Sequence, residues 1–508
     1  MSEPLFHTSC PSCGAPVHVH SATAVTVVCG YCNSMLVRQD DSLHDTGRDS
    51  ALLTDFSPLQ IGTTGRFAAQ GFTLIGRLQA RYEQGVWNEW YARFDDGSHG
   101  WLSEAGDLYV FVRESDLTVS PPKFGNIRAG ETTLQIGKIF VASDVRDIVL
   151  ENAAAQGELP FRLPEKLENR VADFRAENLF LTLDYATEPP QLFMGKTVQL
   201  ADLVLQNLKD ERQIQQQAGS LKGLRQAENC PNCGGSIHWV GGVTQNVICQ
   251  HCGSDLDTSE TQAQLRQANA MRQAQDAAWR LPLGRVGKIR GTNYTVIGAV
   301  RKEELASLDA YAIMHHQSVS AVPQGWWVEY LLYSPQKGFL WLVEVPDDGW
   351  YVSTTLNHFP ILDKNLQPQG ASKLYAYGGR VSYAAGAFYW HIRAGDVNHY
   401  TDYAQGGAKL CAELSPNEWA WSRSVAMTPH ELSAFGLSVN QQARPIKVKT
   451  GQDEPIPSQW RWIAVGVFVI INLPAWLGMS GDDLVFSAIV SFVVLRFVFS
   501  YGKQDEDE

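Results

Sequence analysis

Eight of the nine cysteines fall into four Cys-x-x-Cys pairs, and these pairs form two matched sets. In both sets, fifteen residues separate the two pairs. Two such turns, brought together by a short hairpin, place four sulfurs in a tetrahedron, which is the usual ligand set of a structural zinc ion. The sets are Cys10, Cys13, Cys29 and Cys32, followed by Cys230, Cys233, Cys249 and Cys252.

A redox dithiol or a disulfide is the alternative interpretation of a single Cys-x-x-Cys pair. Four pairs in two matched sets favour metal, so we predict two structural Zn²⁺ ions held by the eight cysteines. Four thiolates fill the coordination shell and leave no position for catalysis. His18 and His238 each follow the second ligand of a set by five residues, and we expect them to be strand residues. Cys411 is the remaining thiol, which we expect to be buried and inert.

The cysteine sets begin two copies of a longer pattern. A Trp-x-Glu-Trp/Tyr motif occurs at 87–90 and 327–330, and a Trp-Leu-x-Glu motif follows at 101–104 and 341–344. The offset between the copies is 220 at the cysteines and 240 at these motifs. The whole unit is therefore a duplication, and the second copy is predicted to carry an inserted loop within 302–324.

This order of motifs resembles a bacterial family known only as a domain of unknown function, number 4178. The resemblance covers about 300 of the 508 residues. It implies no known activity, since none is assigned to the family, and it implies an association with the cell envelope. Besides the two motifs above, the resemblance rests on Ile61-Gly62-x-x-Gly65 and on a Thr-x-Ile-Gly segment that ends at Gly76 or Gly298. It also rests on Gly386-x-Phe-Tyr-Trp390 and Asp402-Tyr403 in the second copy. In the first copy, residues 157–161 replace the Gly386-x-Phe-Tyr-Trp390 motif.

Short alternating segments rich in Trp, Tyr and Phe predict strands separated by turns. We expect a mainly β fold with two zinc ribbons, two small antiparallel β barrel or sandwich domains, helical linkers and a C-terminal transmembrane helical hairpin. The expected units are ribbon 1 at 6–38, β-rich copy 1 at 56–198, a linker helix at 199–226, ribbon 2 at 227–257, a linker helix at 258–280, β-rich copy 2 at 281–440, a linker at 441–460, the hairpin at 461–501 and an acidic tail at 502–508. The linker helices are inferred from Gln, Ala, Leu and Arg at near-helical spacing.

Two apolar stretches near the C-terminus are long enough to cross a bilayer. Residues 462–479 carry no charge, and 484–500 carry only Arg496. At 1.5 Å per residue, each spans close to the thickness of a hydrocarbon core. Lysines and arginines flank the outer ends while two aspartates occupy the turn, so the positive-inside rule places both termini in the cytoplasm. A buried soluble hairpin is the alternative.

The charge and the motif content limit the classes of function that the chain can have. The net charge of −13, without a basic block, disfavours nucleic-acid binding. The first residues show no signal peptide, and free thiolate ligands suit a reducing compartment, so we expect the bulk of the chain in the bacterial cytoplasm at the inner membrane. No sequence motif of an enzyme active site is present. The histidine pair 315–316 is expected in an exposed loop.

We therefore expect a non-enzymatic, membrane-tethered cytoplasmic scaffold or adaptor with membrane-associated protein partners. One alternative is that the β-rich domains bind a small molecule or lipid headgroup and have an enzymatic role. The residues for this alternative are the repeated carboxylates Glu89, Glu104, Glu329 and Glu344. A second alternative is that the ribbons bind nucleic acid.

Overall fold

The computed structural model describes residues 4–39, 42–50, 52, 57–82, 85–105, 108–151, 153–210, 212–213, 225–258, 262–273 and 279–443. These residues belong to one compact unit, 1–446. The expected hairpin at 461–501 and the acidic tail at 502–508 lie outside the described residues. Among the residues that are described, no helix has the length and apolarity needed to cross a membrane.

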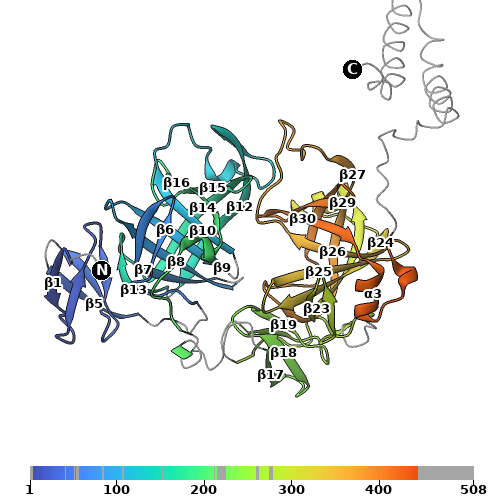
Figure 1. Cartoon of the computed structure of the whole chain (residues 1–508), viewed down its shortest axis with the longest axis horizontal. Helices are drawn as coiled ribbons and strands as arrows, with labels where there is room; N and C mark the ends of the chain where they lie inside the picture. The colour runs from blue at the N-terminus through green and yellow to red at the C-terminus, as the bar shows by residue number, and fades with distance from the viewer. Residues whose placement is uncertain are drawn as a thin grey trace, which may run out of the picture. The chain divides into compact units, whose positions relative to one another are not determined.

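The first copy is built almost entirely of strands, which Figure 1 shows in blue to green. Its ribbon contains β1 (Phe6–Ser9), β2 (Pro16–Val19), β3 (Thr26–Val28), β4 (Ser34–Gln39) and β5 (Ser42–Asp49). Its larger domain contains β6 (Thr64–Phe67), β7 (Gln70–Tyr82), β8 (Gly85–Phe94), β9 (His99–Ala105), β10 (Leu108–Ser115), η1 (Phe124–Asn126), β11 (Thr133–Ile136), β12 (Lys138–Glu151), β13 (Ala154–Leu159), β14 (Lys166–Ala176), β15 (Leu179–Asp184), β16 (Gln191–Val198) and η2 (Leu200–Leu203).

The second copy repeats this plan. Its ribbon contains β17 (Arg225–Asn229), β18 (Ser236–Val240), β19 (Asn246–Ile248), β20 (Asp255–Asp257) and β21 (Gln264–Gln267). Its larger domain contains β22 (Val286–Ile289), β23 (Thr292–Ala306), α2 (Ser307–Met314), β24 (Gly325–Ser334), β25 (Gly338–Val345), β26 (Gly349–Thr355), β27 (Ser372–Phe388), β28 (Val397–Gln405), β29 (Ala408–Leu414), β30 (Trp419–Ala426), α3 (Pro429–Phe435) and η4 (Val439–Gln441).

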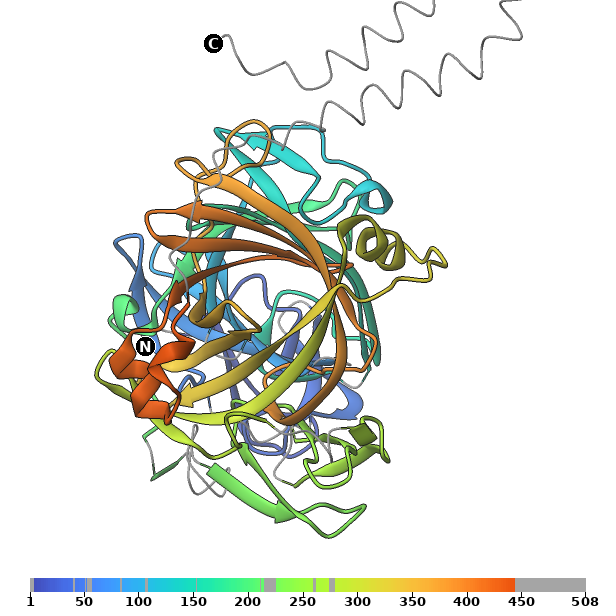
Figure 2. The ribbon, with the colours of Figure 1, turned by 90° about the vertical axis from the view of Figure 1, so that its right-hand side faces the viewer.

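Eight strands of the second copy close into an antiparallel barrel. Their order is β23-β24-β25-β26-β30-β29-β28-β27, and β27 pairs with both β28 and β23, so the sheet returns to its first strand. Figure 2 shows this closed wall in yellow to orange. Of the two expected architectures, barrel and sandwich, the second copy is therefore a barrel.

The first copy has the same strand order with one interruption. Its strands follow β7-β8-β9-β10-β16-β15-β14-β12. The place of β27 is taken by two shorter strands, since β12 pairs with β14 and β13 pairs with β7. This domain is called the first barrel below because it keeps the strand order of the second, although its described residues show no pairing that joins β12 to β13 or β7. The duplication read from the sequence is thus a duplication of the strand plan.

The last aromatic residue of the Trp-x-Glu-Trp/Tyr motif lies in the main core cluster of each copy. In the second copy, Tyr330, Trp350 and Phe435 are almost fully buried in one cluster. Phe435 comes from α3, whose first turn is fixed by a capping box between Thr428 and Glu431. In the first copy, Trp90 lies in the matching cluster. Trp90 and Tyr330 therefore fill the same core position in the two copies.

A separate core cluster joins the two copies. Val141 of the first copy packs in one cluster with Phe359 and Trp419 of the second. The backbone N–H of Phe359 donates to the carbonyl of Glu177 at 2.9 Å. The guanidinium of Arg175 lies 4.9 Å from the ring centroid of Phe359. The described parts of the two copies therefore share buried apolar contacts.

The prediction of linker helices at 199–226 and 258–280 is wrong for most of the residues described there, and 211, 214–224, 259–261 and 274–278 lie outside the described residues. In the first linker, 200–203 form the short η2 turn, 212–213 are helical, and 225–226 begin β17 (Arg225–Asn229). In the second linker, Gln264–Gln267 form β21. These strands pair with β18 and β20 of the ribbon, so tertiary pairing overrides the helical propensity of the Gln- and Ala-rich composition.

The insertion of the second copy lies where the change in offset places it. It follows β23 and begins with α2 (Ser307–Met314), after which the chain runs without regular structure to Gly325. Ala310 and Met314 bury one side of α2. The predicted loop thus contains a short helix.

Candidate metal centres

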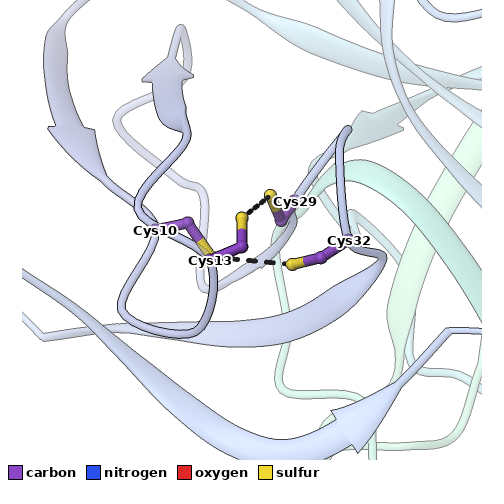
Figure 3. Close-up of side chains that lie close together, drawn as sticks. All are labelled: Cys10, Cys13, Cys29 and Cys32. Carbon is purple, nitrogen blue, oxygen red and sulfur yellow. Dashed lines mark hydrogen bonds between the residues drawn. The ribbon is translucent and has the colours of Figure 1, made fainter.

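The first cysteine set forms one cluster. Cys10 Sγ lies 3.8 Å from Cys32 Sγ, and Cys13 Sγ lies 3.8 Å from Cys29 Sγ. All four sulfurs lie within 4.8 Å of one another. Figure 3 shows the four side chains converging from two turns of the ribbon. Cys10 and Cys29 are buried, Cys32 is half-buried and Cys13 is exposed.

The second set has the same geometry and deeper burial. Cys230 Sγ lies 3.8 Å from Cys252 Sγ, and Cys233 Sγ lies 3.8 Å from Cys249 Sγ. Again the four sulfurs lie within 4.8 Å of one another. Three of them are buried and Cys233 is exposed.

The sulfur positions fit a tetrahedral metal ion. Sulfurs bound at about 2.3 Å to Zn²⁺ lie about 3.8 Å apart along the edges of the tetrahedron. This edge matches the separation of 3.8 Å found for the sulfur pairs above. Among the described residues, each cluster consists of four cysteines alone. The two sites can therefore bind metal ions through four sulfurs each.

The electrostatics of four crowded thiols also favour a bound cation. The Ala15 backbone N–H lowers the pKa of Cys13, but the Cys32 sulfur, desolvation and the other thiols outweigh it and raise this pKa to about 12. The four thiols therefore do not ionise together at neutral pH, and a dication is what would make all four thiolates.

Each ribbon is joined to its barrel by strand pairing. In the first copy β3 pairs with β13, with Val27 opposite Glu158. In the second copy β19 pairs with β27, with Val247 opposite Ala387. The cysteine clusters therefore hold strands that hydrogen-bond to the barrels.

A glycine pair marks the place where the closing strand leaves the barrel for the ribbon. Strand β27 pairs with β23 up to Gly386, which lies opposite Gly298, and pairs with β19 from Gly386 onward. Gly386 has φ +93°, and a Cβ there would overlap the carbonyl oxygen of Ile297. In the first copy Gly157, with φ +71°, lies opposite Gly76. This explains the glycines of both family motifs.

The histidines near the ligands are outside both clusters. His18 lies in β2 opposite His7 of β1, and His238 lies in β18 opposite Ala227. Burial lowers the pKa of His238. As expected, these histidines are strand residues.

Two of the four repeated glutamates anchor the segment that precedes each barrel. Glu104 Oε2 accepts from Trp90 Nε1 at 3.0 Å and from Ser57 Oγ at 2.6 Å. Glu344 accepts from the Tyr330 hydroxyl at 3.1 Å and pairs with Arg280 at 3.0 Å. Both glutamates are about 95 % buried, so they are satisfied structural groups and do not form a solvated face.

The other two repeated glutamates face the barrel interior, where the copies differ. Glu329 accepts from Trp327 Nε1 at 2.7 Å and pairs with Lys302 at 2.9 Å. Lys302 also lies 4.0 Å from Glu413 of β29, a strand that does not neighbour β23, so this contact crosses the interior. Burial lowers the pKa of Lys302, but the carboxylates of Glu329 and Glu413 outweigh burial and raise it.

A second interior ion pair was not identified from the sequence. Lys409 Nζ lies 2.8 Å from Asp402 Oδ2, and Asp402 has no exposed surface. The partly exposed side chains of Lys302 (10 %) and Glu329 (18 %) indicate that water reaches this interior. The alternation of polar residues along β28 and β29 is the sequence signal that points to these groups.

The remaining candidates are not part of a cluster of metal ligands within the described chain. Cys411 is buried beside Asp402, and burial raises the pKa of its thiol. His315 and His316 are exposed after α2, as expected for the insertion.

The family model for a domain of unknown function (DUF4178) matches residues 60–200 and 282–429. These matches cover more than half of the chain and coincide with the two barrels, so the chain belongs to this family, in tandem. The two four-cysteine clusters precede the two matches. No curated protein and no solved structure matches the chain.

Proposed function

We propose that this protein is a non-enzymatic scaffold, tethered to the cytoplasmic membrane, whose two ribbons are clamped by structural Zn²⁺. The observation that carries the proposal is the pairing of β3 with β13 and of β19 with β27. A metal-bound ribbon then extends the barrel sheet. A closed four-sulfur shell supplies cross-linking and no chemistry.

The first test is the metal content of the purified full chain. Mass spectrometry of the native protein should find two zinc ions per chain. Replacing Cys13 and Cys32 by Ser should leave one ion, and Cys411→Ser, the matched control thiol outside the clusters, should leave two. The proposal would be overturned if the chain contained no metal, or if the cluster substitutions did not change its zinc content.

The second test addresses the membrane. We propose that 461–501 insert as a hairpin, with the ribbons and barrels on the cytoplasmic side, because two apolar stretches flank a short acidic turn. The full chain should sediment with membranes and resist extraction by carbonate, and a chain ending at residue 446 should not. A full chain that carbonate releases would contradict the tether.

The third test addresses partners. The buried contacts between the copies would give a scaffold a fixed surface. Cross-linking in intact cells, followed by detergent extraction, should recover the same membrane-associated proteins with the full chain and with Cys411→Ser. These proteins should be lost when both clusters carry Cys→Ser substitutions. Recovery of no specific protein would contradict the scaffold role.

A second candidate function is ligand binding in the interior of the second barrel. Lys302, Glu329, Lys409 and Asp402 form two ion pairs there. Thermal-shift screening of small polar molecules should find a ligand whose stabilisation is lost in Glu329→Gln and kept in Glu89→Gln, the matched change in the first copy. Equal loss in both variants would argue against a site in the second barrel.

A further inference from the structure

The two clusters share their sulfur geometry but differ at one serine. In each ribbon a serine stands two residues after the fourth cysteine, and its hydroxyl oxygen faces that cysteine's sulfur. Ser34 Oγ lies 3.3 Å from Cys32 Sγ, and Ser254 Oγ lies 3.0 Å from Cys252 Sγ. The remaining contacts of each serine decide where its single proton points.

In the first ribbon the proton points away from the sulfur. Ser34 Oγ donates to Asp49 Oδ1 at 3.2 Å. A hydroxyl has one proton, so only oxygen lone pairs of Ser34 face the sulfur of Cys32. A metal-bound thiolate at Cys32 thus receives no hydrogen bond from the Ser34 hydroxyl, and the carboxylate of Asp49 lies on the far side of that hydroxyl.

In the second ribbon the proton is left for the sulfur. Ser254 Oγ accepts from Asn232 Nδ2 at 2.9 Å and from the backbone N–H of Asn269 at 3.0 Å. These two donors occupy its lone pairs, and its own proton can point to Cys252 Sγ. Asn232 Nδ2 also lies 3.6 Å from that sulfur. A thiolate at Cys252 is therefore supported by hydrogen bonds.

Solvent access differs in the same direction. In both ribbons the following segment is hydrogen-bonded to the second knuckle, because Met271 N–H donates to the Gly253 carbonyl and Ser50 N–H donates to the Asn33 carbonyl, each at 2.8 Å. The two sites differ in the burial of the fourth cysteine. Met271 is buried and Cys252 is 5 % exposed, whereas Cys32 is only half-buried. A competing ligand thus reaches the first cluster more easily than the second.

We propose that the first ribbon holds an exchangeable zinc ion and the second ribbon a permanent one. This inference rests on the proposed function, because it requires that both clusters bind zinc. The first ribbon would then attach to β13 only while zinc is available, and the second would stay attached to β27. Groups that orient or hydrogen-bond metal ligands change metal affinity by roughly tenfold to a hundredfold, which sets the expected difference between the two sites.

The experiment follows zinc release from the full chain after adding an excess of a chromophoric chelator. The starting content of two ions tests the proposed function, and the time course tests the inference. We expect two phases of one equivalent each, at least about tenfold apart in rate. Only the slow phase should remain when Cys13 and Cys32 are Ser, and only the fast phase when Cys233 and Cys252 are Ser.

Two single substitutions test the assigned cause. Asp49→Asn removes the acceptor and should slow the fast phase, because the amide can donate to Ser34 and free its proton for Cys32. Ser254→Ala should accelerate the slow phase, whereas Ser236→Ala, a serine of the same ribbon away from Cys252, should not. The inference would be overturned by any of three results. Both ions could leave in one phase, the fast phase could belong to the second ribbon, or Asp49→Asn could leave the fast phase unchanged. Asp49 is exposed, so its variant keeps the test open if Ser254→Ala fails to fold.

Discussion

Lys302 Nζ lies 2.9 Å from Glu329 Oε2 inside the second barrel, with the two side chains 10 % and 18 % exposed. In the first barrel the matching glutamate is Glu89. Ala80 occupies the position that matches Lys302, because Ala80 lies opposite Trp87 and Lys302 lies opposite Trp327, the first tryptophan of the motif in each copy. Both copies therefore keep an interior acid at this position, but the lysine that pairs with it in the second copy is an alanine in the first.

Removing Lys302 should destabilise the second barrel strongly. Lys302→Met leaves the carboxylate of Glu329 in the interior without its ion pair, which costs about 3–5 kcal/mol for a well-buried pair and less where water has access. The double change Lys302→Met with Glu329→Gln should recover most of this loss. Urea denaturation of the four chains of the cycle measures the coupling. Additive effects would show that the pair is not coupled.

Two buried acids of the first barrel should contribute less to its stability as pH rises. Burial raises the pKa of Glu89 to about 7, and burial together with Asp144 raises the pKa of Asp173 to about 7. Unfolded carboxyls titrate near pH 4, so the folded chain binds more protons between about pH 4 and 7. The stabilisation that these two protonated carboxyls supply is therefore complete below this window, decreases through it and is lost above about pH 7.

Glu89→Gln should remove part of that decrease. The difference in melting temperature between the variant and the parent chain should grow in favour of the variant from pH 5 to pH 7. The effect is below about 1.4 kcal/mol per pH unit, since Glu89 keeps partial contact with water. Glu114→Gln, an exposed carboxyl of β10, is the control. A parallel shift at all pH values would refute the assignment.

Alanine at Gly386 should weaken the junction of ribbon and barrel. The residue has φ +93°, and its Cβ would overlap the Ile297 carbonyl, so we expect a loss of at least about 2 kcal/mol in urea denaturation. Gly395→Ala is matched, because Gly395 has φ +91° with nothing within 4 Å of the added Cβ. This control bears the backbone strain without the overlap. Equal losses would mean that the close approach is unimportant.

Removal of metal should expose the ribbons before the barrels. In hydrogen exchange of the full chain, an excess of chelator should strip protection from β3 and β19, whose local fold depends on the clusters. Protection in β24 and β25 should persist, because both neighbours of each strand belong to the barrel. Simultaneous loss in all four strands would show that the ribbons and barrels unfold as one unit.

The local features of the fold could be predicted from the sequence. Both cysteine clusters were predictable because the ligands of one metal lie in two short turns at fixed spacing. The duplication and the position of the insertion were readable because Trp90 and Tyr330 occupy the same core position in the two copies. Gly157 and Gly386, matched only by order along the chain, also occupy equivalent places.

The features that the sequence did not reveal depend on strands that meet only in the folded barrel. The pairing of Lys302 with Glu329 and of Lys409 with Asp402 requires knowing which faces point inward. The predicted linker helices are wrong at 225–226 and at 264–267, where residues of helix-compatible composition pair with ribbon strands. Propensity is a weak signal where such pairing is available.

The pairing of each ribbon with a strand encoded far downstream has a consequence for biogenesis. The second ribbon ends before β23, while its partner residues 386–388 are more than a hundred residues further along. During translation, the cysteine turns leave the ribosome first and can take up their ion while β19 still lacks its neighbour in β27. A nascent chain thus displays an unfilled strand edge until the barrel closes, and the timing of metal capture sets how long that edge is open to aggregation.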